Sequence, residues 1–222
     1  MASAPARPLP ATWREALPVF LAHGSPRVLL AALGLALAAR VAVGGVSAAD
    51  LAPPAVLLAL WPLQEWAIHV LVLHWRPRRL GPWTLDFRVP KKHRAHHADP
   101  SDLALVFIPF HSFAYTLPLM AALCLVLAPT VALALTSLAA YLALALHYEW
   151  IHFLVHTRVW PRRALYQRLW RNHRLHHFKN EHYWFGVTRR GGDRLLRTAP
   201  DPRAVATSAT ARLLHGDAGL TP

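Results

Sequence analysis

Ten of the fifteen histidines in this sequence stand in four short clusters, and their spacing suits them to binding metal ions. Two clusters have the pattern His-x-x-His-His, which places three imidazoles on one face of an α-helix. The other two clusters are pairs, His69 with His74 and His152 with His156. The candidate metal ligands are His69, His74, His93, His96, His97, His152, His156, His173, His176 and His177.

Metal binding explains four such clusters better than the packing of a protein core does. A buried imidazole without a partner costs free energy, and neutral imidazole is a common ligand of first-row metals. One tetrahedral ion offers too few positions, so the sequence predicts two metal ions with about four to five imidazoles each. The step from His69 to His74 does not fit one face of a regular helix. Either these two reach different metals or local unwinding brings them together.

The composition predicts a membrane protein with cationic loops. The chain is 55% hydrophobic and only 16% charged, yet its formal net charge is +13. A nucleic-acid-binding domain would carry basic residues interleaved with aromatics on a soluble surface, so no nucleic-acid partner is expected. Cys124 is the single cysteine, which excludes disulfides within the chain and thiolate metal sites. The first apolar run begins near Val28, so no cleaved signal peptide is expected.

Four apolar segments each reach the roughly 20 residues that cross a bilayer as a helix. They cover residues 28–47, 54–75, 104–127 and 130–157. We therefore expect an all-α fold, an integral membrane bundle of four transmembrane helices with a cytoplasmic helical cap that carries the dimetal site. Arg40 lies inside the first segment and must pair or reach the interface. Pro62, Pro109 and Pro118 are expected to kink their helices.

The distribution of lysine and arginine predicts the orientation of these segments. Basic residues precede the first segment, fill the connection between the second and third, and follow the fourth. The connections at 48–53 and 128–129 contain none. By the positive-inside rule both termini and both basic connections are cytoplasmic. All four histidine clusters then lie at the cytoplasmic face, and a bacterial inner membrane is expected.

Three regions are expected along the chain. They are an N-terminal tail at 1–27 with a possible interfacial helix at 10–24, a membrane domain at 28–203 and a mobile C-terminal tail at 204–222. A helix at 10–24 would place Trp13, Leu17, Phe20 and Leu21 on one side, as in a helix that lies in the membrane interface.

A metal pair held by nitrogen beside lipid suggests oxidation of an apolar substrate. Two irons supplied with two electrons can activate O2 against an unactivated C–H bond, whereas zinc would act only as a Lewis acid or make hydroxide. Glu65 and Glu149 lie four and three residues before a clustered histidine. Either glutamate can be a ligand, but we expect both to orient imidazoles through the far ring nitrogen.

The order of the four clusters resembles the fatty acid hydroxylase/sterol desaturase superfamily of membrane di-iron enzymes, over about residues 60–200. The segment HHFKNEHYWFGVT is similar to the one that follows the last cluster in fatty acid 2-hydroxylases. The segment YEWIHFLVH resembles their Tyr-Asp-x-x-His motif, in which Tyr148 matches and Glu149 replaces the usual aspartate. The resemblance implies that both side chains stand beside the metal ligands.

The resemblance implies O2-dependent hydroxylation of a long acyl chain at C2, with two iron ions as cofactors and O2 as co-substrate. Zinc can replace iron in a purified sample. The substrate would be a fatty acid or acyl lipid in a groove between the helices, with Trp184 and Phe185 as its walls or as interfacial aromatic residues. No haem-binding motif is present, so electrons are expected from a separate donor, such as a ferredoxin or a b-type cytochrome with its reductase.

The remaining five histidines are expected to play other roles. His23, His111 and His215 have no cluster neighbours and are interpreted as structural. His147 and His182 have no place in the ten-ligand pattern, although His182 lies close enough in sequence to approach the site.

Two alternative functions remain open. The same ten ligands would serve a desaturase or hydroxylase of a sterol-like or carotenoid lipid. A non-enzymatic metal transporter or sensor is the second alternative. Transport requires ionisable residues through the membrane centre, and apart from Arg40 the spans offer few.

Overall fold

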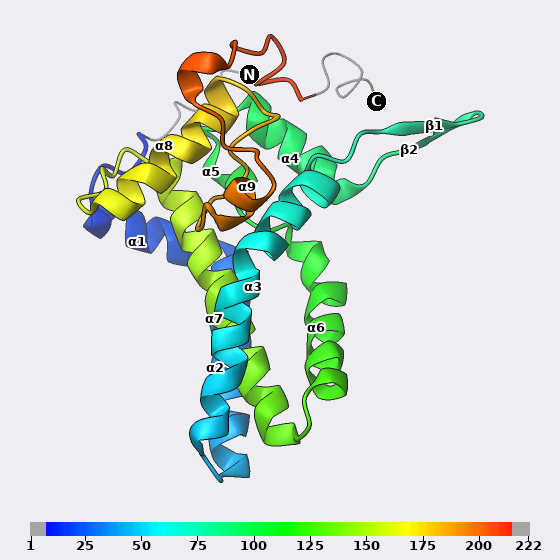
Figure 1. Cartoon of the computed structure of the whole chain (residues 1–222), viewed down its shortest axis with the longest axis vertical. Helices are drawn as coiled ribbons and strands as arrows, with labels where there is room; N and C mark the ends of the chain where they lie inside the picture. Colours follow the sequence, from blue (N-terminus) through cyan, green and yellow to red (C-terminus); the bar gives the residue numbers. More distant parts are fainter. Residues whose placement is uncertain (1–7, 215–222) are drawn as a thin grey trace.

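The computed structural model describes residues 8–214 as a helical stem that carries a helical cap (Figure 1). The stem consists of α2 (Gly24–Val43), α3 (Ala52–Ile68), α6 (Phe113–Leu127) and α7 (Val131–Val155). The cap contains α1 (Trp13–Ala22), α4 (Arg88–Ala98), α5 (Leu103–Val106), α8 (Ala164–Phe178) and α9 (Gly191–Leu195). Shorter helical turns are η1 (Ala48–Leu51), η2 (His69–Leu73), η3 (Phe110–Ser112) and η4 (Pro202–Ala204).

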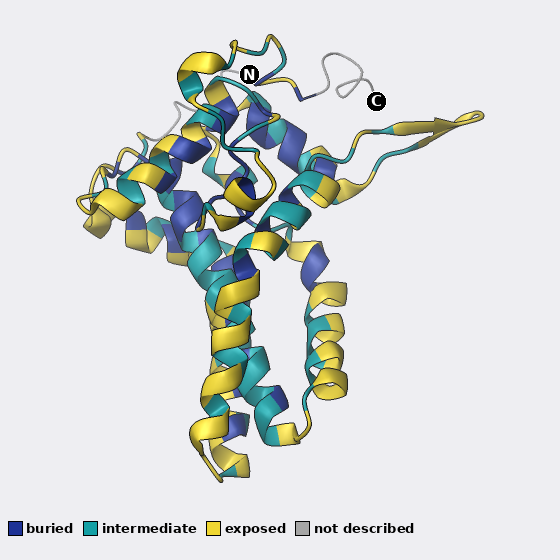
Figure 2. Ribbon diagram, in the orientation of Figure 1, coloured by how far each residue is buried: buried dark blue, intermediate teal, exposed yellow. Residues whose placement is uncertain are grey.

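The stem has the surface of a membrane-spanning bundle. Four stretches are long and apolar enough to cross a bilayer, each with a mean hydropathy of 1.7: Gly24–Val43, Ala48–Leu73, Leu103–Leu127 and Val131–Val155. Most of the stem is exposed or half-buried, whereas buried residues concentrate in the cap (Figure 2). Exposed leucines and valines on a stem of this length require a lipid environment. The predicted membrane bundle with a histidine-rich cap is confirmed.

The helices α2 and α7 form the best-packed pair of the stem. Ala36 on α2 and Ala139 on α7 are buried in the same cluster as Leu29 and Leu142. Small residues at such a contact let two backbones approach closely. At the far end of the stem Arg40 forms an ion pair of 2.8 Å with Asp50, so its predicted need for a partner is met.

The third apolar segment is broken, although the sequence predicts one kinked helix. Its first turn, α5, ends at Val106, and α6 begins at Phe113. Pro109 lacks an N–H group and disfavours helical backbone in the residue before it. The freed N–H of Ile108 donates to Glu149 Oε1 at 2.7 Å. Pro118 is accommodated inside α6.

A short antiparallel hairpin departs from the all-α prediction. The strands β1 (Arg78–Leu80) and β2 (Trp83–Leu85) pair beside α4 and project from the cap (Figure 1). Gly81 has a φ of 61°, which fits the first position of a two-residue hairpin turn. The three-residue strands are too short to give an alternating pattern that stands out in the sequence.

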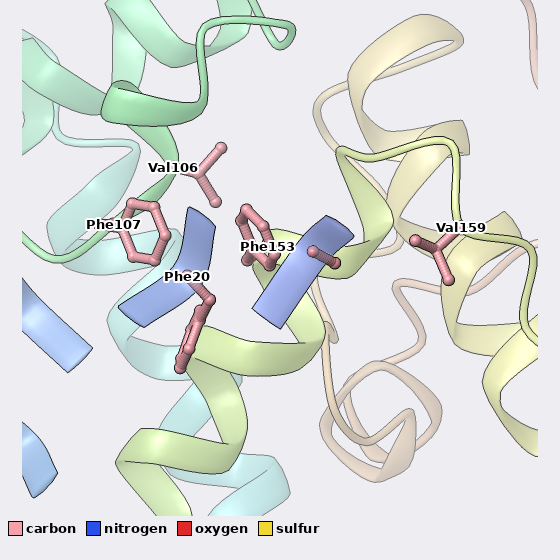
Figure 3. Packing of buried hydrophobic residues seen from close by; sticks show 6 residues of the cluster. Phe20, Val106, Phe107, Phe153 and Val159 are labelled. Atoms are coloured by element: carbon pink, nitrogen blue, oxygen red, sulfur yellow. The ribbon is translucent and has the colours of Figure 1, made fainter. Parts of the chain in front are cut away.

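Of the four predicted apolar residues of the helix α1, only Phe20 is buried. Phe20 is buried against Phe107 and Phe153 (Figure 3). Trp13 and Leu17 are half exposed, as an interfacial helix requires.

The described part of the predicted C-terminal tail packs on the domain and does not project from it. The backbone N–H of Ser208 donates to Lys179 O at 2.7 Å, and Ala211 and Leu214 are buried. Residues 1–7 and 215–222, including His215, lie outside the described residues.

Candidate metal centre

The ten predicted histidines come together inside the cap as two groups of five. We call the first group site 1, and it consists of His69, His74, His93, His97 and His176. The second group, site 2, consists of His96, His152, His156, His173 and His177. Within each group the nearest ligand atoms all lie within 4.8 Å of one another. Every one of these side chains is buried except His74, which is half-buried.

Each His-x-x-His-His helix serves both sites. On α4, His93 and His97 belong to site 1 and His96 belongs to site 2. On α8 the division is reversed, because His173 and His177 belong to site 2. The centroids of the stacked His97 and His177 rings are 4.1 Å apart. The two sites are therefore neighbours, and α4 and α8 hold them at a fixed separation.

A π-helical turn resolves the irregular spacing of His69 and His74. The turn η2 has the wider hydrogen bonding of a π-helix, and the N–H of His74 donates to His69 O at 3.0 Å. A five-residue step on such a turn returns to the same face, so both rings enter site 1. Of the two alternatives from the sequence, the structure shows local distortion of the helix, and it places both rings in one group.

The distances between ring nitrogens fit a shared metal ion. Two nitrogens bound at about 2.1 Å and at right angles would stand about 3 Å apart. In site 1, His74 Nε2 lies 3.2 Å from His176 Nε2. In site 2, His173 Nε2 lies 3.1 Å from His156 Nε2 and 3.0 Å from His177 Nε2.

Backbone carbonyls orient half of the imidazoles and leave the other nitrogen for a metal. His69 Nδ1 bonds Phe185 O at 2.7 Å, while its Nε2 is buried without a partner. His176 Nδ1 bonds Tyr183 O at 2.8 Å. The remaining pairs are His97 Nδ1 with Ala211 O at 3.0 Å, His152 with the backbone of Val106, and His156 with the backbone of Pro100. Such partners fix the tautomer of a ligand.

Burial keeps these imidazoles in the neutral form that binds metals. The pKa values of four ligands lie well below the usual value: His93, His96, His173 and His177. The larger cause is burial of the ring away from water, and the smaller cause is repulsion from neighbouring imidazoles. The same burial lowers the pKa of His156 to about 3. Protonated imidazoles would repel one another at these distances, so the neutral cluster suits a cation.

Glu65 does not bond an imidazole, contrary to the expectation from the sequence. Its carboxylate accepts hydrogen bonds from the N–H groups of Val187 and Thr188 and from the Thr188 hydroxyl. The carboxylate thus holds the loop that presents Phe185 O to His69. The expectation fails because His69 Nδ1, the nitrogen that Glu65 would bond, is already hydrogen-bonded to Phe185 O.

Glu149 also lacks the expected contact with a histidine. Its Oε1 accepts from Ser25 Oγ at 2.5 Å and from Ile108 N, so it ties α2 and the break after α5 to α7. The Tyr148 ring does contact a ligand, with its centroid 5.6 Å from that of His152.

Asp193 is a buried residue that the sequence did not single out. Its carboxylate accepts from the N–H groups of Phe185 and Gly186 and from Thr198 Oγ1. Gly186 is required here, because a Cβ would lie 2.1 Å from Arg189 O. An isolated aspartate in a basic segment carries no signal for this role.

A cavity of about 400 Å³ connects the histidines with the stem. It is lined by residues of α3, α4, α6 and α7, including Tyr148 on α7, and by residues at the break after α5. His69 and His93 of site 1 and His152 of site 2 all border it. Its outer walls include Tyr115 and Leu119, which are exposed on the stem. An apolar molecule in the cavity would therefore reach both sites from the side of the stem.

Trp184 and Phe185 do not line this cavity, although the sequence predicted them as groove walls. Trp184 is buried, with a φ of 58°, and its Nε1 donates to Pro200 O at 3.2 Å. Phe185 packs its ring against His69 and His176 and so closes site 1 from the other side. Neither residue is exposed enough to belong to an interfacial belt.

Among the described residues, the histidines outside the clusters stay outside the two sites. His182 is exposed and lies 3.6 Å from Glu181, so it does not approach site 1. His147 borders a second cavity, away from the ten ligands. His23 stacks on Phe107, and His111 is exposed.

Fold and site together define a membrane protein with two adjacent histidine sites beside an apolar cavity. A family model described as fatty acid hydroxylase matches residues 54–198, and the chain belongs to this family. The chain is 28% identical to the dihydroceramide fatty acyl 2-hydroxylase FAH2 of Arabidopsis thaliana over 147 residues, which cover 66% of this chain and 60% of that protein. A solved structure, "Full length scs7p (only hydroxylase domain visible)", shares the fold with a TM-score of 0.65 and 22% identity, over 89% of this chain and 70% of that chain. The matched stretch covers less than two thirds of the length of that plant protein.

Proposed function

We propose that this protein is an O2-dependent di-iron hydroxylase that inserts a hydroxyl group at C2 of a long acyl chain. The observation that carries the proposal is the single apolar cavity bordered by histidines of both sites. Family membership and the similarity to a fatty acyl 2-hydroxylase support the reaction class and the position.

The donor set fits two iron ions, one in each site. Five imidazoles exceed the four positions of a tetrahedral zinc site, and imidazole also suits iron. Bound iron, given electrons and O2, supplies the oxidising power that no side chain has. Zinc would occupy the same nitrogens in a purified sample without that power.

The residues of this chain position the substrate and exclude water. The cavity walls bind the acyl chain through apolar contact. Val106 and Phe107, at the break between α5 and α6, are part of these walls. The Tyr148 ring lines the cavity beside His152, so it forms the wall next to that ligand. Exposed Tyr115 and Leu119 mark the entrance from the membrane.

We further propose that the cap and both termini face the cytoplasm of a bacterial cell. The supporting observation is that the connection at the opposite end of the stem, around η1, carries Asp50 and no basic residue. Electrons would then come from a separate cytoplasmic donor, such as a ferredoxin or a b-type cytochrome.

The test is a pair of histidine variants in the full-length protein. His176→Ala removes one ligand of site 1, and His182→Ala removes an exposed histidine that belongs to neither site. We expect cells with the wild type and His182→Ala to contain acyl lipids heavier by one oxygen. His176→Ala should abolish this product and lower the bound iron.

Product mass separates hydroxylation from the alternatives. A loss of two hydrogens would indicate a desaturase, and an oxidised sterol-like or carotenoid lipid would indicate a different substrate on the same site. Full hydroxylation by His176→Ala would contradict the proposal.

A further inference from the structure

The cavity beside the histidines has a charged end and an uncharged end. One face of α7 lines it, from Tyr141 and Leu142 through Ala145 to Tyr148 and His152. At 1.5 Å per residue this face is about 16 Å long. The metal ligands border one end, and at the other end the Tyr141 hydroxyl already accepts a hydrogen bond from Gln64 at 2.9 Å. A single-chain amphiphile would therefore lie with its head at the histidines.

Lys92 stands at the histidine end of this cavity. Among the described residues that line the cavity it is the one lysine or arginine. It precedes His93 on α4 and lines the cavity together with His152. One of its three N–H groups donates to Phe107 O at 2.8 Å.

The charge of Lys92 has no direct counter-ion among the described residues. Glu149 and Asp102 attract it electrostatically, but neither carboxylate reaches ion-pair contact with Nζ. Glu149 Oε1 accepts from Ser25 and Ile108, and its buried Oε2 makes no hydrogen bond to Nζ. An ammonium group beside an apolar cavity is stabilised by an anionic ligand. The arrangement thus fits a substrate whose head carries negative charge.

We propose that Lys92 binds the carboxylate of a free, single-chain fatty acid and so holds its first carbons beside sites 1 and 2. This inference rests on the proposed function and names its substrate class. An acyl chain in amide linkage offers a neutral oxygen, which lacks the attraction between opposite charges that a carboxylate adds to the hydrogen bond. A carboxylate held by Lys92 also explains hydroxylation near the carboxylate, because the more distant carbons of the chain would lie along the stem, away from the histidines.

The experiment measures binding to the metal-loaded, full-length protein in detergent at a pH where the fatty acid is ionised. The two probes are hexadecanoate and hexadecanamide, which share one chain and differ in the charge of the head. The wild type should bind hexadecanoate about 10-fold to 100-fold more tightly, the range expected for a hydrogen bond to a charged group. Lys92→Met should remove this preference, and Lys92→Arg should retain it.

Lys91→Met is the matched control, since Lys91 is the exposed neighbour on the same helix. It should leave both affinities unchanged. Equal binding of the two probes by the wild type would overturn the inference without any variant, and so would an unaltered preference in a folded Lys92→Met. If cells still produce hydroxylated acyl lipids in that case, the proposed function stands and only the substrate class is wrong. If no such lipid forms with any substrate, the proposed function itself fails.

Discussion

Sites 1 and 2 have the same number of imidazoles but depend on different parts of the chain. In site 1 the orienting carbonyls belong to Tyr183, Phe185 and Ala211, which all follow the last histidine cluster. In site 2 they belong to Pro100 and Val106, between the second and third clusters. Site 1 is therefore assembled only when the C-terminal segment folds back. One shared pair of helices thus holds two sites whose imidazoles are oriented by different segments of the chain.

The largest effects should come from removing one ligand of either site. His93→Ala and His96→Ala change neighbouring residues of α4 that belong to site 1 and site 2 respectively. Each variant should lose one metal ion and about 1000-fold or more of the hydroxylation rate, since a catalytic metal contributes several kcal/mol. Metal analysis and product yield check both. Loss of both ions from each variant would show that the sites are not separable.

Asp193→Ala should weaken site 1 and spare site 2. The variant leaves the N–H groups of Phe185 and Gly186 and the Thr198 hydroxyl without their acceptor, at a cost of about 1–3 kcal/mol in unfolding free energy. Displacement of Phe185 O should lower metal affinity in site 1 about 10-fold to 100-fold. Thermal unfolding and metal titration measure the two effects.

Asp201→Ala is the control for that variant, because exposed Asp201 accepts only the local N–H of Arg203. It should leave metal binding unchanged. Equal weakening of both sites by Asp193→Ala would contradict the division between them.

Inserting one alanine after Val72 should lengthen the step from His69 to His74 from five residues to six. His74 would then rotate out of site 1 by about 100°. We expect site 1 to bind its metal about 10-fold more weakly while site 2 is unchanged. Val72→Ala keeps the chain length and should behave as the wild type in the same metal titration. Normal affinity after the insertion would show that His74 is not a ligand.

The smallest effect should come from Thr210→Val. This change removes the hydrogen bond of 2.5 Å from Thr210 Oγ1 to Glu181, which helps to hold the segment that presents Ala211 O to His97. We expect about 1 kcal/mol lower stability and a few-fold lower metal affinity in site 1. Thr207→Val, at an exposed neighbour, is the control in the same chemical denaturation series. A larger loss of metal affinity in site 2 than in site 1 would contradict the proposed dependence of site 1 on this segment.

The ligand set and the spans could be predicted from the sequence because both have periodic or compositional signals. Four histidine clusters and four apolar segments are visible without coordinates, and the structure brings all ten predicted side chains together. The positions of Glu65 and Glu149 could not be inferred correctly. Spacing placed them near histidines, but which backbone N–H groups they meet depends on loops that are distant in sequence.

Lys92 and Asp193 were missed for a related reason. A lysine in a basic stretch is normally interpreted as a solvated charge, and only the cavity beside it gives it a candidate ligand. The partition of ligands between sites was equally hidden, because neighbours such as His96 and His97 turn in different directions on α4. Such features arise from tertiary packing, which no local pattern encodes.

The central claim is that sites 1 and 2 each hold a metal ion. Anomalous diffraction at the iron edge, from crystals of iron-loaded protein, tests it directly. We predict two peaks of anomalous density, one among His69, His93 and His176 and the other among His96, His152 and His173. A single peak, or peaks away from these imidazoles, would contradict the account.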